Sequence, residues 1–304
     1  MRKWTTADIP AQTGRTAVVT GTGGLGFETA LALVCAGADT IIAGRNPQKG
    51  ADAVARISAE VPSARVRFEL LDLASLASVA AFAARLVDEE QKIDLLINNA
   101  GVMVPPRREE TKDGFELQFG TNYLGHFALT QQVLPLLRKA GNARVVSLSS
   151  IAARSGAINL GDLNAENGYK PMPAYSQSKL ACLMFGLELQ RRSIAGAWGI
   201  TSVIAHPGIA RTDLLHNAPG RWSGVGLTRT LLWFLFQPAS QGALPTLFAA
   251  TSADAKPGGY YGPDGLGGTR GFPAPARVPP AALDEAVARR MWEASEALIH
   301  GLGY

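Results

Sequence analysis

The stretch TGTGGLG at residues 20–26 decides the fold, together with the apolar run TAVV at 16–19 before it and FETALALVCAGA at 27–38 after it. Its glycines at 21, 23 and 26 form a G-x-G-x-x-G pattern between a predicted strand and a predicted helix. Glycine lets the chain turn tightly and lets backbone N–H groups approach a pyrophosphate at a helix N-terminus. A Gly-rich turn can also serve packing alone. The place of this pattern in the first βα turn of a βαβ unit favours a nucleotide-binding loop.

Strand-like and helix-like segments alternate along the chain. Apolar runs of four to six residues without alternation are typical of parallel strands covered on both faces. The repeated strand–helix–strand order predicts an α/β, Rossmann-type doubly wound parallel sheet with helices on both faces. We expect one domain over 1–304, because no repeat or linker interrupts the pattern. The expected strands are 16–20, 40–44, 66–73, 94–101, 143–150, 200–208 and a short one at 259–261 in a Pro/Gly-rich surface excursion (256–280), and the expected helices are 25–37, 47–61, 77–90, 115–140, 174–193 and 283–299.

Composition excludes several classes of protein. The 304 residues are 47% hydrophobic and 18% charged with a net charge of +4, which suits a packed core and not a disordered chain. No Lys/Arg cluster interleaves with aromatics, so we expect no nucleic-acid partner. Cys35 and Cys182 lie far apart in apolar runs, where we expect buried packing, and no residue set has metal-ligand spacing. The first residues lack a signal-like apolar region, and the most apolar window, 227–236, is shorter than a membrane span, so we expect a cytoplasmic protein.

The end of the second predicted strand bears on the choice of cofactor. An NAD site usually places an acidic residue there, about 20 residues after the glycines, for the ribose 2′-OH. This chain reads AGRN at 43–46, with Arg45 where the acid would stand. A guanidinium favours a 2′-phosphate through charge-assisted hydrogen bonds, although a solvated surface arginine would look the same in sequence. We interpret the pattern as a preference for NADP(H) over NAD(H).

A second group of residues suggests the chemistry. YSQSK at 175–179 places Tyr175 and Lys179 at i and i+4 on one helix face. A free phenol is a poor base at neutral pH, and a nearby ammonium group stabilises the phenolate. Such a tyrosine can protonate a developing alkoxide or deprotonate an alcohol. Ser149 and Ser150 end a buried strand at the sheet edge where α/β proteins bind ligands. Asn122 lies within a predicted helix, where an asparagine is unfavourable unless its side chain has a hydrogen-bond partner.

Together these motifs resemble the short-chain dehydrogenases/reductases, specifically the retinol-dehydrogenase-like branch of that family. The resemblance runs from about residue 13 to the end of the chain. It implies a Rossmann sheet of about seven strands and the activity of a short-chain dehydrogenase/reductase, which the pattern at Arg45 leads us to expect to be NADP-dependent. The motifs that carry it are TGTGGLG (20–26), LLDLAS (70–75), NNAG (98–101), TNYLGHF (121–127), VVSLSS (145–150), YSQSK (175–179), HPGIART (206–212), GGYYGP (258–263) and ARRMWEASEAL (288–298).

The resemblance also implies roles for single residues. Tyr175 matches the catalytic acid/base, and Lys179 matches the residue that stabilises its phenolate and holds the nicotinamide ribose. Ser150 matches the serine that hydrogen-bonds the substrate oxygen, with Ser149 as the alternative if the alignment differs by one residue. Asn122 matches the asparagine that supports a proton-relay water. The implied cofactor contacts are Gly21, Gly23, Gly24, Leu25, Gly26, Arg45, Asn46, Asp72, Leu73, Asn99, Ala100, Gly101, Tyr175, Lys179, Pro207, Gly208, Ile209 and Thr212.

Two features depart from compact members of the family. Only two residues separate Gly21 from Gly24, so the loop is one residue shorter and lacks one candidate ligand for a 2′-phosphate. Arg45 therefore carries more of the predicted cofactor preference. The loop at 151–174, between the serine and tyrosine motifs, is longer than in compact members, as it is in the retinol-dehydrogenase-like branch.

The predicted substrate lid at about 213–242 is very apolar, and a C-terminal extension follows at about 263–304. The lid suits a wall for a hydrophobic small-molecule substrate. Peripheral membrane contact through an interfacial helix, a dimer contact and plain core packing are the other interpretations. The helices expected at 115–137 and 174–190 resemble those that pair in family dimers, which makes a homodimer one expectation.

We therefore expect hydride transfer between NADP(H) and a carbonyl or alcohol carbon of a hydrophobic small molecule. Reduction of an activated C=C bond stays open, because the same tyrosine can protonate carbon or oxygen. A non-catalytic nucleotide-sensing protein is the alternative from another class. Such proteins usually lose part of the Tyr/Lys/Ser set, which this chain retains.

Overall fold

Residues 3–210 and 237–303 are described by the computed structural model of the chain. They form an eight-stranded sheet in the order β3-β2-β1-β4-β5-β6-β7-β8. Neighbouring strands from β3 to β7 run parallel, which confirms the doubly wound Rossmann-type sheet. The strands are β1 (Thr16–Thr20), β2 (Asp39–Gly44), β3 (Val66–Leu70), β4 (Leu95–Asn98), β5 (Arg144–Leu148), β6 (Thr201–Ala205), β7 (Tyr260–Gly265) and β8 (Arg270–Pro275).

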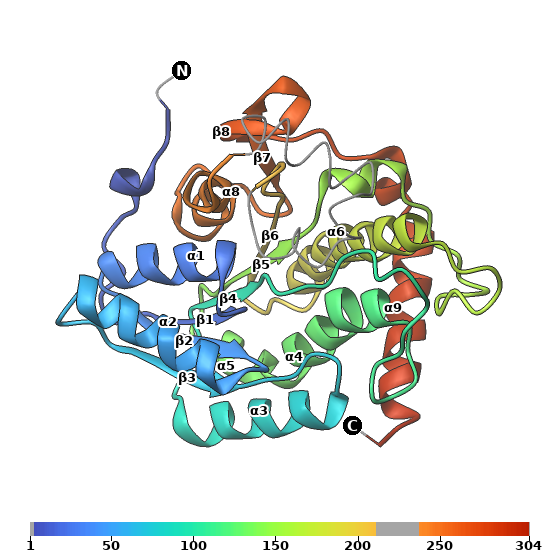
Figure 1. The fold of residues 1–304 in the computed structure, drawn as a ribbon, viewed down its shortest axis with the longest axis horizontal. Coiled ribbons are helices and arrows are strands. Elements are labelled where there is room, and N and C mark those ends of the chain that lie inside the picture. Colours follow the sequence, from blue (N-terminus) through green and yellow to red (C-terminus); the bar gives the residue numbers. More distant parts are fainter. Residues whose placement is uncertain (1–2, 211–236, 304) are drawn as a thin grey trace.

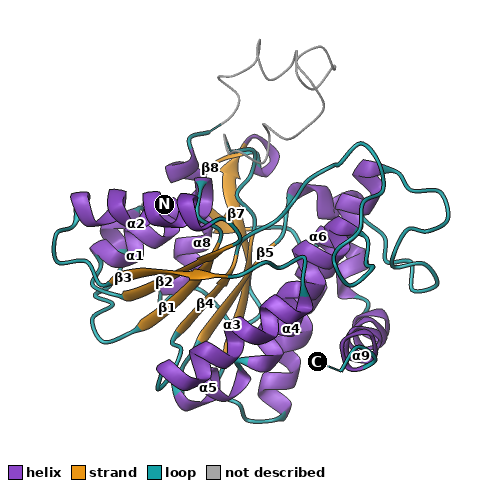
Figure 2. Cartoon of the chain, turned by 60° about the horizontal axis from the view of Figure 1, so that its bottom comes forward, coloured by secondary structure: helices purple, strands orange, loops and turns teal. Residues whose placement is uncertain are grey.

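Helices cover both faces of this sheet (Figures 1 and 2). Helices α1, α2 and α8 pack on one face, and α3, α4 and α6 pack on the other, with α9 beside α6. The helical segments are η1 (Thr6–Asp8), α1 (Gly24–Cys35), α2 (Pro47–Glu60), α3 (Leu76–Glu89), the π-helix η2 (Phe119–Leu124), α4 (Gly125–Gln132), α5 (Leu134–Lys139), η3 (Ile151–Ser155), α6 (Pro171–Ala195), α8 (Ala239–Thr251), η6 (Leu266–Gly268), η7 (Pro280–Leu283) and α9 (Glu285–His300).

Local sequence signals explain where these helices begin. The Asn46 side chain accepts the backbone N–H of Lys49 and caps α2, where Pro47 fits the first helical position. Ser75 caps α3 and Asp284 caps α9 in the same way. The apolar runs of the central strands lie buried between the two helical layers, and burial on both faces explains why apolar and polar residues do not alternate in them. The expected helices and parallel strands are therefore confirmed, except in the Pro/Gly-rich segment and at 115–140.

The Pro/Gly-rich segment contains more regular structure than predicted. The short strand expected at 259–261 is the longer β7, and the residues after it form a second strand where only a surface excursion was expected. This strand, β8, returns antiparallel to β7 and adds an eighth strand at the edge of a sheet expected to have about seven. Gly267 and Gly268 have φ of +68° and +89°, and glycine adopts this left-handed backbone without steric cost at the turn between the strands.

The single helix expected at 115–140 is wrong. The chain forms the π-helix η2, then α4, and ends α4 at Gln132 before α5 begins. Pro135 explains the second break, because proline lacks an N–H and its ring collides with the carbonyl of the residue four before it.

Two other expectations have different outcomes. Cys182 is buried as predicted, but Cys35 is exposed, because it lies off the face that α1 packs on the sheet. Most of the expected lid at 213–242 falls within 211–236, outside the described residues, as does Thr212. The described part of the lid segment includes the beginning of α8.

The C-terminal helix α9 packs across the outer side of α4 and α6 (Figure 1). Trp292 is buried, and its ring centroid lies 4.9 Å from that of Phe127 and 5.7 Å from that of Phe185. The Arg192 guanidinium lies 4.3 Å from the Trp292 ring centroid on a further side. The helix is therefore an integral part of the core on this face of the molecule.

Replacing the Trp292 side chain tests this packing. We expect Trp292→Ala to lower the free energy of unfolding by about 3–5 kcal/mol, because it removes a large buried ring and leaves a cavity. Urea unfolding followed by circular dichroism measures the change. Leu283→Ala, at a side chain 61% exposed, is the control and should change stability by less than about 0.5 kcal/mol. Equal unfolding midpoints for both variants would contradict the packing of α9.

Candidate active site

A cavity of about 680 Å³ opens where the carboxyl ends of β1, β4, β5 and β6 meet. This edge is where doubly wound sheets bind ligands, at the reversal of strand order between β1 and β4. The cavity brings together the glycine loop, the Asn99 segment, both serines and the Tyr/Lys pair. Its lining is Gly21–Leu25, Lys49, Asp52, Ala53, Arg56, Asn99–Gly101, Met103, Leu148–Ala152, Met172, Tyr175, Lys179 and Pro207–Ala210.

The glycine loop is shaped for a close ligand. Gly21 has φ of +101°, and a Cβ there would lie 2.8 Å from the Asn99 side-chain nitrogen. A Cβ at Gly26 would collide with the Gly21 carbonyl oxygen, so this glycine is needed for packing of the turn and not for the ligand. Helix α1 begins at Gly24 and directs its N-terminus at the cavity wall. The Asn99 Oδ1 atom is buried without a protein partner beside this loop. These features fit the phosphates and amide groups of a dinucleotide.

A second cavity of about 270 Å³ adjoins the first and shares Gly21, Thr22, Lys49, Ala100 and Gly101 with it. It lies between the ends of β2 and β3. Four residues expected to contact the cofactor line this cavity but not the first: Arg45, Asn46, Asp72 and Leu73. The expected cofactor contacts are therefore divided between two adjoining cavities.

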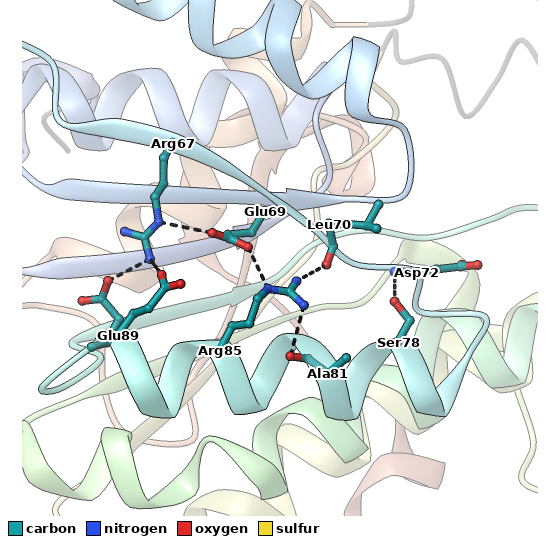
Figure 3. Close-up of polar contacts among 9 residues, drawn as sticks. Arg67, Glu69, Leu70, Asp72, Ser78, Ala81, Arg85 and Glu89 are labelled. Carbon is teal, nitrogen blue, oxygen red and sulfur yellow. Dashed lines mark hydrogen bonds and ion pairs between the residues drawn. The ribbon is translucent and has the colours of Figure 1, made fainter.

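Hydrogen bonds and an ion pair hold the end of β3 and the residues up to Asp72 that follow it (Figure 3). Arg85 on α3 donates to the Leu70 carbonyl at 2.8 Å and to Glu69 at 3.1 Å. The Asp72 N–H donates to the Ser78 hydroxyl at 3.0 Å, while its carboxylate accepts the Ala74 N–H. The Asp72 carboxylate therefore has a hydrogen-bond donor next to it in sequence, and Asp72 and Leu73 both line the smaller cavity.

The two serines at the end of β5 differ in their bonding. Ser149 is buried and donates its hydroxyl to the Lys179 carbonyl at 2.8 Å. The Ser150 oxygen accepts the Ala152 N–H at 3.2 Å, which caps η3 and leaves the hydroxyl hydrogen able to donate elsewhere. The geometry therefore favours Ser150 over Ser149 as the residue that can hydrogen-bond a ligand in the cavity.

Tyr175 and Lys179 lie one turn apart on α6 and line the same cavity. Both side chains are buried, at 6% and 5% exposure. The Lys179 ammonium donates to the Leu148 carbonyl at 3.2 Å and lies 6.0 Å from the centroid of the Tyr175 ring. An ammonium group has three donors, so this contact leaves others for a ligand.

Asn122 lies in the π-helix η2 and does not line either cavity. Its Oδ1 atom accepts the Val102 N–H at 2.7 Å, and its Nδ2 atom donates to the Val102 carbonyl at 3.0 Å. Nδ2 also donates to the Ser178 hydroxyl at 3.0 Å. The partner expected for this helical asparagine is therefore the loop after β4 and the helix that carries Tyr175.

His126 links the glycine loop to η2. Burial lowers its pKa to about 4, so the ring is neutral at physiological pH. Nδ1 lies 2.9 Å from the Asn122 carbonyl, an acceptor, so Nδ1 carries the proton and Nε2 accepts the Thr20 hydroxyl at 2.9 Å. These contacts give His126 a structural role. The Cys182 thiol also donates to the Asn122 carbonyl, at 3.2 Å.

The loop after β6 closes the cavity with Pro207, Gly208 and Ile209. Gly208 has φ of +65°, and a Cβ there would collide with the Thr269 carbonyl, so this position requires glycine. His206 beside it is buried, and burial lowers its pKa to about 4. Its Nδ1 atom accepts the Gly208 N–H at 3.3 Å, which supports the loop.

Sequence reasoning missed several wall residues. Lys49 and Arg56 on α2 and the methionines Met103 and Met172 all line the larger cavity. Lys49 could have been found, since it lies four residues after Arg45 in the first turn of α2. Met103 and Met172 lie in segments without a periodic pattern, and only the folded chain brings them to one cavity.

Residues 3–210 and 237–303 hold neither a metal-binding cluster nor a membrane-spanning helix. No group of three or more His, Cys, Asp or Glu side chains within these ranges could hold a metal ion. Within the same residues, each helix is too short or too polar to cross a bilayer.

Comparison with known proteins identifies the family. A model described as short chain dehydrogenase matches residues 15–221. Mouse retinol dehydrogenase 13 is 41% identical over 96% of this chain and 85% of its own length, and mouse polyprenol dehydrogenase is 40% identical over 93% and 83%. The crystal structure of an uncharacterised Mycobacterium paratuberculosis protein is 40% identical, covers 98% of both chains and has a TM-score of 0.81. The chain therefore belongs to the short-chain dehydrogenase/reductase family, whose members are oxidoreductases that use nicotinamide cofactors.

Proposed function

We propose that this protein is an NADP(H)-dependent oxidoreductase that acts on a carbonyl or alcohol carbon of a hydrophobic small molecule. One observation carries the proposal. Ser150, Tyr175 and Lys179 line the same cavity as the glycine loop, so a dinucleotide on the loop would bring its reactive end to the Tyr/Lys pair. The glycine loop, the Asn99 segment and the Pro207–Ile209 loop would hold the cofactor.

The residues of the cavity supply an acid and hydrogen bonds to the reacting oxygen. The bound cofactor supplies the hydride in reduction and accepts it in oxidation. In reduction, Ser150 and Tyr175 hydrogen-bond the carbonyl oxygen, and Tyr175 transfers its hydroxyl proton to that oxygen as the C–H bond forms. Lys179 stabilises the resulting phenolate through its ammonium charge. The reverse order of the same steps oxidises an alcohol.

The proposed preference for NADP(H) rests on cations around the smaller cavity. Arg45 and Lys49 both line it, and both are exposed, so they can approach an added phosphate without a large desolvation cost. Asp72, the acid in that wall, has its carboxylate oxygens engaged by the Ala74 N–H and, at 3.2 Å, by Lys112. Two cations beside an aspartate whose carboxylate already has partners favour binding of a 2′-phosphate over binding of a ribose hydroxyl.

The proposed substrate class rests on the apolar side of the larger cavity. Met103, Ile151, Met172 and Ile209 line it near Tyr175 and Ser150. Retinol and polyprenol, which give two relatives their names, are long apolar alcohols. An apolar wall with few polar groups favours such a ligand over a sugar or a charged acid.

Removal of the Tyr175 hydroxyl tests the proposed acid. We expect Tyr175→Phe to lower kcat for NADPH-driven reduction of all-trans-retinal by at least about a hundredfold, because general acid catalysis contributes about that much or more. Its NADPH Kd, measured by nicotinamide fluorescence, should not change. Tyr261→Phe is the control, since its hydroxyl accepts the Lys256 N–H away from the cavity. Unchanged turnover in Tyr175→Phe would contradict the assigned proton transfer.

Removal of the two cations tests the proposed cofactor preference. We expect Arg45→Ala and Lys49→Ala each to raise the NADPH Kd about tenfold, the cost of one charge-assisted hydrogen bond, and to leave the NADH Kd unchanged. Titration of both cofactors by nicotinamide fluorescence measures the values. Arg65→Ala, at an exposed arginine paired with Asp39 before β3, is the control. Equal weakening of NADPH and NADH would contradict a contact with the 2′-phosphate.

A further inference from the structure

Gln118 is a fully buried polar residue that the proposed reaction does not use. It stands at the beginning of the π-helix η2, one turn before Asn122. Its side chain has no exposed surface. The buried Glu116 carboxylate accepts the Gln118 and Phe119 N–H groups at 3.0 and 2.6 Å, which fixes the backbone from which this side chain starts. Because the Gln118 side-chain amide is buried, it needs hydrogen-bond partners within the protein.

Those partners lie in two segments that are far apart in sequence. Gln118 Oε1 accepts the Val104 N–H at 2.7 Å, in the loop after β4. Gln118 Nε2 donates to the Pro171 carbonyl at 3.1 Å, at the first residue of α6, and to the Tyr169 hydroxyl at 3.2 Å. Tyr169 in turn donates to the Pro105 carbonyl at 2.9 Å. One amide therefore ties the loop after β4 to the beginning of the helix that carries Tyr175.

The loop conformation depends on these bonds. Val104 has φ of +46°, a left-handed backbone that a β-branched residue rarely adopts. Such strain persists only where the surroundings hold it, and it is often found beside functional sites. The Val104 N–H bonds to Gln118, while the Val102 N–H and carbonyl bond to Asn122. Two buried amides thus grip the loop on both sides of Met103.

The gripped segments each place a methionine in the cavity wall. Met103 lies between the two held residues, and Met172 directly follows Pro171. Both line the larger cavity, and Met172 is 51% exposed, so it lies at the mouth. Methionine side chains are flexible and adapt to apolar ligands, so their backbone positions have to set the width between them.

We propose that Gln118 is a positioning residue for substrate selection, which sets the spacing of the Met103 and Met172 walls at the mouth of the cavity. The inference rests on the proposed function, since it concerns the substrate end of the same site. It assigns Gln118 no contact with cofactor or substrate. Long apolar substrates fill the mouth and depend on its width, whereas short ones reach Tyr175 without contacting both walls.

The test compares a long and a short aldehyde in the full-length protein. For Gln118→Met we expect the ratio of kcat/KM for all-trans-retinal to that for hexanal to fall about tenfold, since misplaced substrate contacts have costs of this size or larger. The loss should appear mainly in the KM for retinal, with the NADPH Kd unchanged. Tyr169→Phe removes only one link of the network and should shift the ratio in the same direction by less, which keeps the test open if Gln118→Met folds poorly.

Gln190→Met is the matched control. Gln190 is also a buried glutamine, and its Oε1 atom accepts the Ser202 N–H at 2.8 Å near the other end of α6. It should lower stability without changing the substrate ratio. An equal change of the ratio in Gln190→Met, or an unchanged ratio in Gln118→Met, would overturn the proposal.

Amide hydrogen exchange separates this inference from the proposed function. In Gln118→Met the Val104 amide and the segment 169–172 should exchange faster than in the unmodified protein, and in Gln190→Met they should not. If the unmodified protein reduces neither aldehyde, the proposed function fails, and the exchange rates alone decide whether Gln118 holds both walls. Unchanged exchange in Gln118→Met overturns the inference in either case.

Discussion

The Thr20 hydroxyl at the end of β1 is the contact on which the site depends. It accepts the N–H groups of Asn99 and Ala100 at 2.9 and 3.0 Å, and it lies 2.9 Å from His126 Nε2. The Asn99 side chain returns a hydrogen bond to the Thr20 carbonyl at 2.7 Å. These bonds join the carboxyl ends of β1 and β4 to His126 on α4 at the reversal of strand order, and His126 in turn bonds to the Asn122 carbonyl of η2. A small change there would move the glycine loop, the Asn99 segment and the π-helix together.

Much of the fold and the glycine turn after β1 could be predicted from sequence, because their signals are local. Buried parallel strands lack alternation, and the glycines mark the turn after β1. The β7–β8 hairpin was not predicted, because Pro and Gly along Arg270–Pro275 hide an edge strand whose pairing depends on β7. The π-helix was missed because helical periodicity does not distinguish it from an α-helix over six residues. Gln118 carries no sequence signal, since its partners are two backbone groups and a tyrosine hydroxyl in distant segments.

The packing of α9 changes how the outer face of α4 and α6 should be interpreted. Their sequences resemble helices that pair between subunits, and such a face has to be covered because it is apolar. Here Trp292 stacks on Phe185 and contacts Phe127 from within the same chain. The Tyr123 hydroxyl bonds to Ser295 at 2.7 Å, and this buries its polar end as well. A second copy that used this face would have to pack against α9 or displace it.

The two ends of the site are built with different stiffness. At the end formed by the glycine loop and the loop after β6, backbone groups approach so closely that a Cβ at Gly21 or Gly208 would not fit, and the shape is fixed by the chain itself. At the end lined by Met103 and Met172, the wall consists of adaptable side chains on segments that buried amides hold in place. Under the function proposed above, such an arrangement would keep the hydride donor and the Tyr175 hydroxyl in constant geometry while the apolar wall adjusts to the ligand. On that proposal, selection among substrates depends on where the backbone of the wall is held, and Gln118 and Asn122 hold it through hydrogen bonds to Val104 and Val102.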